Sequence, residues 1–219
     1  MNNRHGCFIT LEGGEGVGKT TNMAYITAQL DQAGIDWIRT REPGGTPLAE
    51  NIRQLLLNSG DEKPCDTTEL LLMFAARAQH LQQVILPALQ KGTWVVCDRF
   101  TDASFAYQGG GRGQSEQTLE LLEQLVQEGL QPNLTLLLDM PVELASQRVD
   151  KRGEVRDRFE QEQQAFFQRV RDAYLQRALQ HPLRFRVVDA SLPLPQVQQQ
   201  LDEYLQPLIE NWHYSGETP

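Results

Sequence analysis

Cysteine is scarce in this chain, and its placement excludes two kinds of small stabilised domain. The three cysteines, Cys7, Cys65 and Cys97, are far apart and none belongs to a C-x-x-C pair. Such spacing supports neither a structural zinc site nor a disulfide framework. We therefore expect the 219 residues to be stabilised by an ordinary hydrophobic core, with the thiols among its small apolar side chains.

Long apolar runs and positive charge are also missing. No stretch approaches the ~20 apolar residues of a membrane helix, and the N-terminus has no apolar segment of signal-peptide form. These absences predict a soluble, cytoplasmic protein without a membrane partner. The net charge of −9 argues against a nucleic-acid partner, because such binding needs a basic field. The net charge does not argue against a small nucleotide, because a few groups in the binding site are enough to hold it.

What the chain does contain, near its start, is a glycine-rich segment in a defined context. An apolar run at residues 7–11 leads into this segment, and a helical pattern follows it. Its sequence fits the phosphate-binding loop G-x-x-x-x-G-K-[ST], whereas a glycine turn that binds nothing would not require the Lys-Thr pair. Backbone N–H groups and the helix N-terminus bind phosphate there, Lys19 adds a cation, and Thr20 adds a hydroxyl ligand for Mg²⁺. The residues expected to contact ATP are Gly13, Gly14, Glu15, Gly16, Val17, Gly18, Lys19 and Thr20.

Apolar strand-like runs alternate with helical patterns along the whole chain. This alternation, without repeats or a low-complexity linker, predicts an α/β fold: a three-layer sandwich with a five-stranded parallel sheet. We expect one domain over residues 1–212 and a loose tail over 213–219. The expected strands are residues 7–11, 35–40, 93–98, 134–139 and 185–189.

Polar residues follow two of these strands, at the sheet edge where parallel α/β proteins bind ligands. Asp98 closes an apolar strand and is suited to organise Mg²⁺, through water, beside a phosphate loop. Arg41 and Glu42 begin a Pro-Gly turn, for which a solvated turn is an equal alternative. Within a long helix expected over residues 67–90, Arg77 interrupts an apolar surface and therefore needs a carboxylate or a ligand as partner.

Two further segments suggest binding. If residues 100–108 form a helix, Ser104, Tyr107 and Gln108 share one face and could recognise a planar base; an ordinary polar loop is the alternative. Residues 148–158 carry five cations, with arginines spaced by four, and predict a mobile arginine-bearing lid at about 148–160. A solvated helix face with ion pairs is the alternative for the lid.

A phosphate loop indicates a nucleoside triphosphate but not its use. A GTPase would carry an Asn-Lys-x-Asp guanine reader, which the chain lacks, and a nucleotide sensor would not need arginines from several elements. A small-molecule kinase would need them, because phosphoryl transfer depends on positioning and charge neutralisation. A phosphate acceptor requires no general base, whereas a hydroxyl acceptor does. Glu42 could be that base, so a deoxynucleoside kinase and a non-catalytic nucleotide-binding protein remain alternatives.

Four segments together resemble bacterial thymidylate kinases, which are nucleoside-monophosphate kinases of the P-loop type. They are the loop at 13–20, Thr-Arg-Glu-Pro-Gly-Gly-Thr at 40–46, the Asp98 to Gly111 segment and Asp-Arg-Phe-Glu at 157–160, in matching order over about residues 7–210. The resemblance implies a homodimeric dTMP kinase that uses ATP and Mg²⁺ to form dTDP for dTTP synthesis.

The resemblance also implies roles for individual residues. Lys19, Arg99, Glu15 and two lid arginines, Arg152 and Arg156, would be catalytic. The lid would supply this charge because Gly16 stands where some members of the family place an arginine. The family usually has an aromatic residue four positions before its equivalent of Arg77; here that position is Met73, and we expect the neighbouring Phe74 to contact thymine instead. The implied dTMP-binding residues are Glu42, Pro43, Arg53, Phe74, Arg77, Arg99, Ser104, Tyr107 and Gln108.

Overall fold

The structure, a computed structural model, describes residues 5–58, 62–152, 159 and 162–214. Five parallel strands form one sheet in the order β2-β3-β1-β4-β5, which confirms the predicted α/β sandwich and places β1 at its centre. The strands are β1 (Phe8–Glu12), β2 (Trp37–Arg41), β3 (Trp94–Asp98), β4 (Leu134–Asp139) and β5 (Phe185–Asp189).

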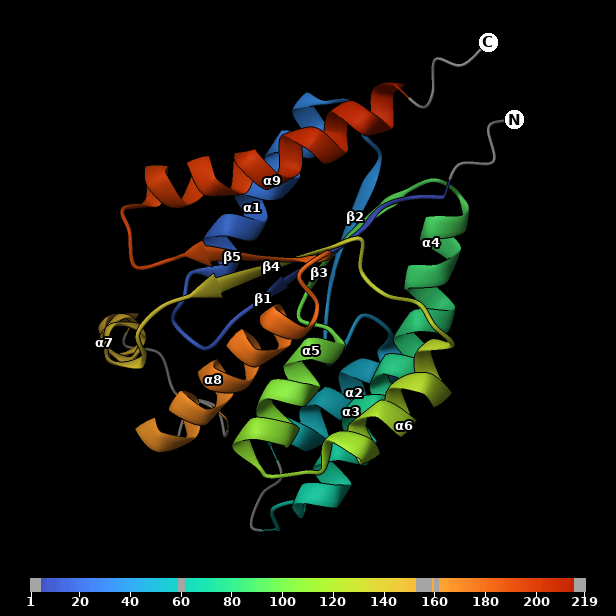
Figure 1. Cartoon of the computed structure of the whole chain (residues 1–219). Helices are drawn as coiled ribbons and strands as arrows, with labels where there is room; N and C mark the ends of the chain where they lie inside the picture. The colour runs from blue at the N-terminus through green and yellow to red at the C-terminus, as the bar shows by residue number, and fades with distance from the viewer. Residues whose placement is uncertain (1–4, 59–61, 153–158, 160–161, 215–219) are drawn as a thin grey trace.

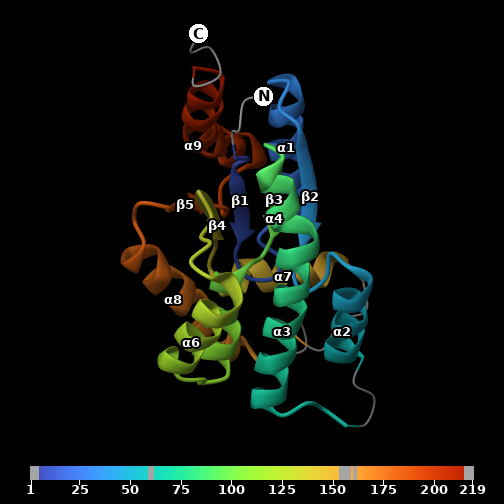
Figure 2. The same cartoon turned by 90° about the vertical axis from the view of Figure 1, so that its right-hand side faces the viewer.

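Helices cover both faces of the sheet (Figures 1 and 2). On one face lie α1 (Lys19–Gln32) and α9 (Leu194–Tyr214), while α7 (Val142–Arg152) lies beyond the carboxyl edge of the strands. The helices of the other face are α2 (Pro47–Leu57), α3 (Asp66–His80), α4 (Leu86–Gln90), α5 (Thr101–Ser104), α6 (Glu116–Gln127) and α8 (Gln164–Gln180).

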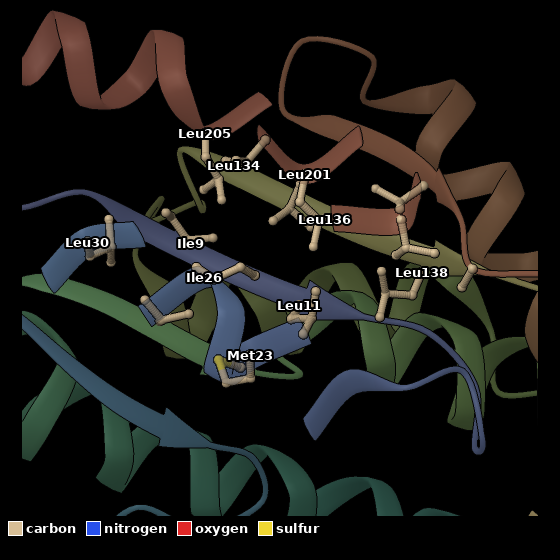
Figure 3. Close-up of a cluster of buried hydrophobic side chains, with 14 of the residues drawn as sticks. Ile9, Leu11, Met23, Ile26, Leu30, Leu134, Leu136, Leu138, Leu201 and Leu205 are labelled. Carbon is tan, nitrogen blue, oxygen red and sulfur yellow. The ribbon is translucent and has the colours of Figure 1, made fainter. Parts of the chain in front are cut away.

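The core explains why β1 is apolar along its length. Successive side chains of a strand point to opposite faces, and both faces of this sheet are covered. Ile9 and Leu11 point into the layer formed by α1 and α9 (Figure 3), whereas the Phe8 ring packs edge-on against Phe100 on the other side, with ring centroids 4.9 Å apart. The glycine-rich loop that follows β1, and α1 after it, therefore start from a buried strand at the centre of the sheet.

The predicted helix over residues 67–90 forms as one helical stretch with a change of hydrogen-bond pattern. Between α3 and α4 lies a π-helical turn, η1 (Leu81–Ile85). Pro87 stands in the first turn of α4 and has no N–H to donate, which explains why the regular ladder breaks just before it. The predicted helix at 100–108 likewise forms α5 followed by a π-helical segment, η2 (Phe105–Gly111).

At the end of the chain, α9 continues to Tyr214, two residues past the predicted end of the domain. The rest of the predicted tail lies outside the described residues. In the part of the chain that the structure describes, no helix combines the length and apolarity needed to cross a lipid bilayer.

Candidate active site

The phosphate loop connects the centre of the sheet to α1. Gly18 caps α1 with φ +93°, a left-handed conformation that favours glycine, and contributes no capping side chain. The Lys19 amine donates hydrogen bonds to the carbonyl oxygens of Gly14, at 2.8 Å, and Gly13, at 3.3 Å. Burial, and then the nearby Arg99 guanidinium, lower the pKa of Lys19. An anion in the loop would raise the pKa of Lys19 again, because a nearby negative charge favours the ammonium form.

A polar cavity of about 470 Å³ opens on the inner side of this loop. Thr20 lines it from α1, and Asp98 lines it from the carboxyl end of β3, which pairs with β1. Among the described residues, none hydrogen-bonds to the buried Oδ1 atom of Asp98. A buried carboxylate oxygen beside a hydroxyl, both facing a phosphate site, fits the oxygen ligands that Mg²⁺ or its water shell prefers.

Arg99 connects the loop to the rest of the site. Its Nη1 donates to the Gly13 carbonyl oxygen at 2.9 Å and to the Tyr174 hydroxyl at 3.2 Å, and its Nη2 donates to Glu15 Oε1 at 2.5 Å. The guanidinium carbon lies 4.7 Å from the centroid of the Tyr107 ring, whose hydroxyl donates to Glu15 at 3.1 Å. The guanidinium is therefore held over the loop, with an acidic side chain beside it.

A second cavity, of about 80 Å³, lies beside Arg99. Eight of the nine residues predicted to bind dTMP line it, so the structure brings together segments that the sequence only suggested. The exception is Phe74. The remaining lining residues are Glu15, Leu57, Met73, Phe100, Ala103 and Phe159.

The structure places Met73, rather than Phe74, at this cavity. The Phe74 side chain is fully buried in a separate cluster with Leu70, Phe105 and Leu119. There its ring stacks on the inner side of Arg77, 4.6 Å from the guanidinium carbon. The expected contact between Phe74 and the base is therefore corrected: Met73 faces the cavity because it lies four residues before Arg77, on the same face of α3.

Arg77 is buried beside the second cavity, and its guanidinium is held from several directions. Its Nε donates to Glu42 Oε2 at 2.7 Å, and its Nη2 donates to the Phe100 carbonyl and the Ser104 hydroxyl. No described residue pairs with its Nη1. The other Glu42 oxygen lies 3.1 Å from Nδ1 of His80, so this buried carboxylate orients the arginine. The buried Nη1 is thus the one guanidinium nitrogen of Arg77 that the described residues leave unpaired.

Gln108 lines the second cavity from η2, and its side-chain amide is held by Glu69. Its Nε2 donates to Glu69 Oε1 at 2.9 Å, and Glu69 is 1% exposed. Arg112 lies 3.5 Å from Glu69 and 2.7 Å from Glu162. The predicted face of Ser104, Tyr107 and Gln108 thus forms, although on a helix that changes from α to π type within it.

The two cavities meet at four charged residues that line both of them. Arg53 is one; its Nη1 donates to the Pro43 carbonyl at 3.1 Å. Such a junction can hold two anions end to end, because guanidinium groups neutralise phosphate oxygens from several directions. The four shared residues are Glu15, Glu42, Arg53 and Arg99.

The predicted lid begins within α7. Arg148 is exposed on this helix, Arg152 is its last residue, and Arg156 lies outside the described residues. A Cβ atom at Gly16, where φ is +76°, would lie 2.3 Å from the Ala145 carbonyl oxygen of α7. The loop therefore has no room for an arginine at position 16 with α7 packed in this way.

Sequence reasoning missed several residues that support the site. Glu12 is fully buried and accepts hydrogen bonds from the Phe100 amide at 2.7 Å and the Tyr174 hydroxyl at 2.8 Å. A carboxylate closing an apolar strand directly before the loop was a usable signal for Glu12. Tyr174 and Glu69 carry no local signal in the sequence, since their partners are distant along the chain.

Comparison with known proteins gives a consistent result. The thymidylate kinase family model matches residues 11–201. Among curated relatives, a thymidylate kinase of Chromohalobacter salexigens is 61% identical over 208 residues, covering 94% of this chain and 98% of the relative. A thymidylate kinase of Ectopseudomonas mendocina is 59% identical and covers 94% of this chain and 97% of the relative.

A solved structure supports the same relationship at the level of the fold. The crystal structure of a thymidylate kinase from Ehrlichia chaffeensis aligns with a TM-score of 0.74 at 31% sequence identity. The alignment covers 92% of this chain and 99% of that structure. The similarity therefore extends over most of the fold.

Proposed function

Because the chain belongs to the thymidylate kinase family, we propose that it transfers the γ-phosphoryl group of ATP to dTMP and releases dTDP and ADP. The observation that carries this proposal is the junction at which four charged residues line both cavities. A donor on the loop and an acceptor in the smaller cavity would meet there with their anionic ends facing each other. The product would feed dTTP synthesis.

On the donor side, ATP would bind along Gly13 to Thr20. The loop amides and the N-terminus of α1 would hold its phosphates, and Lys19 would leave the loop carbonyls to contact the β- and γ-phosphates. Thr20 and Asp98, the latter through water, would hold Mg²⁺; the Asp98 oxygen without a hydrogen-bond partner supports this role. When bound, Mg²⁺ neutralises and bridges phosphate oxygens.

On the acceptor side, dTMP would occupy the second cavity. Arg53 and Arg99 would hold its phosphate at the junction, beside Glu42 and Pro43. The thymine ring would lie over Met73, with Arg77, Ser104 and Gln108 at its polar edge. Tyr107 would crowd the 2′ position of the sugar and favour deoxyribose.

Transfer would depend on charge neutralisation rather than on a general base. A phosphate acceptor is already ionised, so the residues need only hold two repelling anions in line. Arg99 would contact the acceptor, and Lys19 would contact the group in transfer. Arg152 and Arg156 of the lid would contact the same group and supply the positive charge that an arginine at position 16 supplies in some members of the family. Glu15 would order a magnesium-linked water or the sugar.

The pairing of Glu42 argues against the deoxynucleoside kinase alternative. One of its carboxylate oxygens accepts from Arg77 at 2.7 Å, and the other faces His80 at 3.1 Å. A general base for a sugar hydroxyl would need an oxygen directed at the acceptor. We assign Glu42 the task of orienting Arg77.

The assembly and location that we propose are a homodimer in the cytoplasm. Exposed leucines on the adjacent helices α3 and α6, which face the viewer in Figure 2, support the dimer: Leu71, Leu121 and Leu125. A twofold interface would cover such a surface. The three free thiols suit a reducing compartment.

A coupled assay of ADP release tests the proposed activity. With ATP and Mg²⁺, we expect ADP release that depends on dTMP and is abolished by a chelator. Thymidine should replace dTMP poorly or not at all. Turnover of thymidine without turnover of dTMP would support the deoxynucleoside kinase, and ATP binding without acceptor-dependent ADP release would support a nucleotide-binding protein.

A further inference from the structure

The orientation of the Gln108 side-chain amide decides what the second cavity offers to a base. An amide can present either its NH₂ group or its carbonyl oxygen, and these have opposite hydrogen-bonding character. Gln108 has its Nε2 atom 2.9 Å from Glu69 Oε1. Because an ionised carboxylate only accepts hydrogen bonds, the NH₂ group must face Glu69. The carbonyl oxygen is then the end left for the cavity that Gln108 lines.

Glu69 is itself held in place. It is 1% exposed, and the guanidinium of Arg112 lies 3.5 Å from its Oε1 atom. A buried carboxylate needs such a partner, because an unpaired charge there would be costly. Arg112 is fixed in turn by Glu162, at 2.7 Å, and by the Phe166 ring, 4.8 Å from its guanidinium carbon. The acceptor that faces Gln108 is therefore part of an ordered cluster.

The two sides of the cavity together define a pattern of donor and acceptor. Arg77 and Gln108 both line the cavity. The buried Nη1 of Arg77 is a donor that no described residue pairs with, and the carbonyl of Gln108 is the acceptor at the end of its amide that does not face Glu69. Thymine offers the complementary pair, a carbonyl at position 4 and an N–H at position 3. Cytosine carries an amino group at position 4 and an unprotonated nitrogen at position 3, so both contacts would be mismatched. Unpaired buried polar groups are strongly disfavoured, which makes this a basis for selectivity.

We propose that Glu69 is a positioning residue that sets base selectivity by fixing the orientation of the Gln108 amide. The inference rests on the proposed dTMP kinase activity. Glu69 does not line the cavity; it acts through Gln108. If Glu69 were replaced by glutamine, its amide could both donate and accept, so Gln108 could turn and present its NH₂ group to cytosine N3.

The test is the selectivity of Glu69→Gln between dTMP and 5-methyl-dCMP, which share the 5-methyl group and differ at positions 3 and 4. We expect the ratio of kcat/KM values, dTMP over 5-methyl-dCMP, to fall at least tenfold. The fall should come from KM, because Glu69 is remote from the phosphate junction. Asp66→Asn is the matched control: Asp66 also faces Arg112, at 3.9 Å, on the same helix. Its ratio should stay at the wild-type value.

An unchanged ratio in Glu69→Gln would overturn the proposal, as would an equal fall in both variants, which would indicate a general effect of charge. A wild-type protein that does not phosphorylate dTMP would refute the proposed activity instead. If Glu69→Gln does not fold, NMR of the wild-type dTMP complex gives the answer. Nuclear Overhauser contacts should join the Gln108 NH₂ protons to the side-chain protons of Glu69; the absence of those contacts would overturn the proposal.

Discussion

Glu12 controls the geometry of Arg99 from two directions. Its carboxylate accepts from the Phe100 amide, directly after Arg99, and from the Tyr174 hydroxyl, which in turn accepts from the Arg99 guanidinium. Arg99 has φ +69°, a left-handed conformation that is costly for a residue with a Cβ atom. The buried hydrogen bonds to Glu12 help to hold this backbone conformation. One side chain outside both cavities thus supports the arginine at their junction.

Glu12 should make the stability of the protein dependent on pH. Burial, and then the negative charge of Asp102, raise the pKa of Glu12 to about 8, from an ordinary value of 4.5. At pH values between these two pKa values, Glu12 is ionised in the unfolded chain but keeps its proton in the folded protein. The free energy of unfolding should therefore fall as the pH rises. The fall attributable to Glu12 should occur between these two pKa values and be absent at pH values below both of them.

Urea unfolding from pH 5 to pH 8.5 measures this effect. Glu12→Gln should flatten the fall in the free energy of unfolding across that window. Glu116→Gln, at an exposed position of α6, is the control and should keep the wild-type slope. Parallel profiles for the wild type and Glu12→Gln would mean that Glu12 is already ionised in the folded protein.

Among the elements, α3 contributes one continuous helix face to the acceptor site. Glu69, Met73 and Arg77 are spaced by four residues and therefore share one face of the helix. That face provides the carboxylate that orients Gln108, an apolar surface and the free guanidinium donor. Phe74 lies one position further along, about 100° around the helix, and packs inward.

This arrangement predicts different effects for two neighbouring substitutions. Met73→Ala should raise KM for dTMP roughly tenfold, because an apolar contact worth about 1–2 kcal/mol is lost. Phe74→Leu should leave that KM close to the wild-type value but lower the free energy of unfolding by on the order of 1–2 kcal/mol, because it loosens a buried cluster. Steady-state kinetics and urea unfolding of both variants provide the measurements. The reverse pattern would return the thymine contact to Phe74.

The elements also show what could be predicted from the sequence. The phosphate loop and all five strands were predictable, because strand, loop and helix signals are local and agreed with one another. The choice between Met73 and Phe74 was not predictable, since both are apolar and only the packing of α3 against α6 and η2 decides which of them is buried away from the cavity. The pair of Glu12 and Tyr174, 162 residues apart, likewise depends on the tertiary fold.

At the scale of the whole molecule, the exposed leucines of α6 predict the oligomeric state. We expect the wild-type protein to be a dimer of about 50 kDa, twice the chain mass of 24.9 kDa. Replacing both Leu121 and Leu125 by aspartate should produce monomers, because paired carboxylates in an apolar interface are unfavourable. Light scattering after size-exclusion chromatography measures the mass.

Leu183→Asp is the control for this experiment. Leu183 is 93% exposed, but it belongs to the loop before β5 and to neither α3 nor α6. The variant should remain dimeric. A monomeric wild type, or a dimeric double variant, would show that α6 does not form the interface.

The path of the chain has a practical consequence. His5 precedes the amino end of β1, while α9 runs from the carboxyl edge of the sheet back across it for about 30 Å (Figure 1). Both ends of the described chain therefore lie at the edge opposite the phosphate loop. A fluorophore, an affinity label or a solid support can be attached at either end, and the immobilised enzyme would keep both of its substrate entrances open to solution.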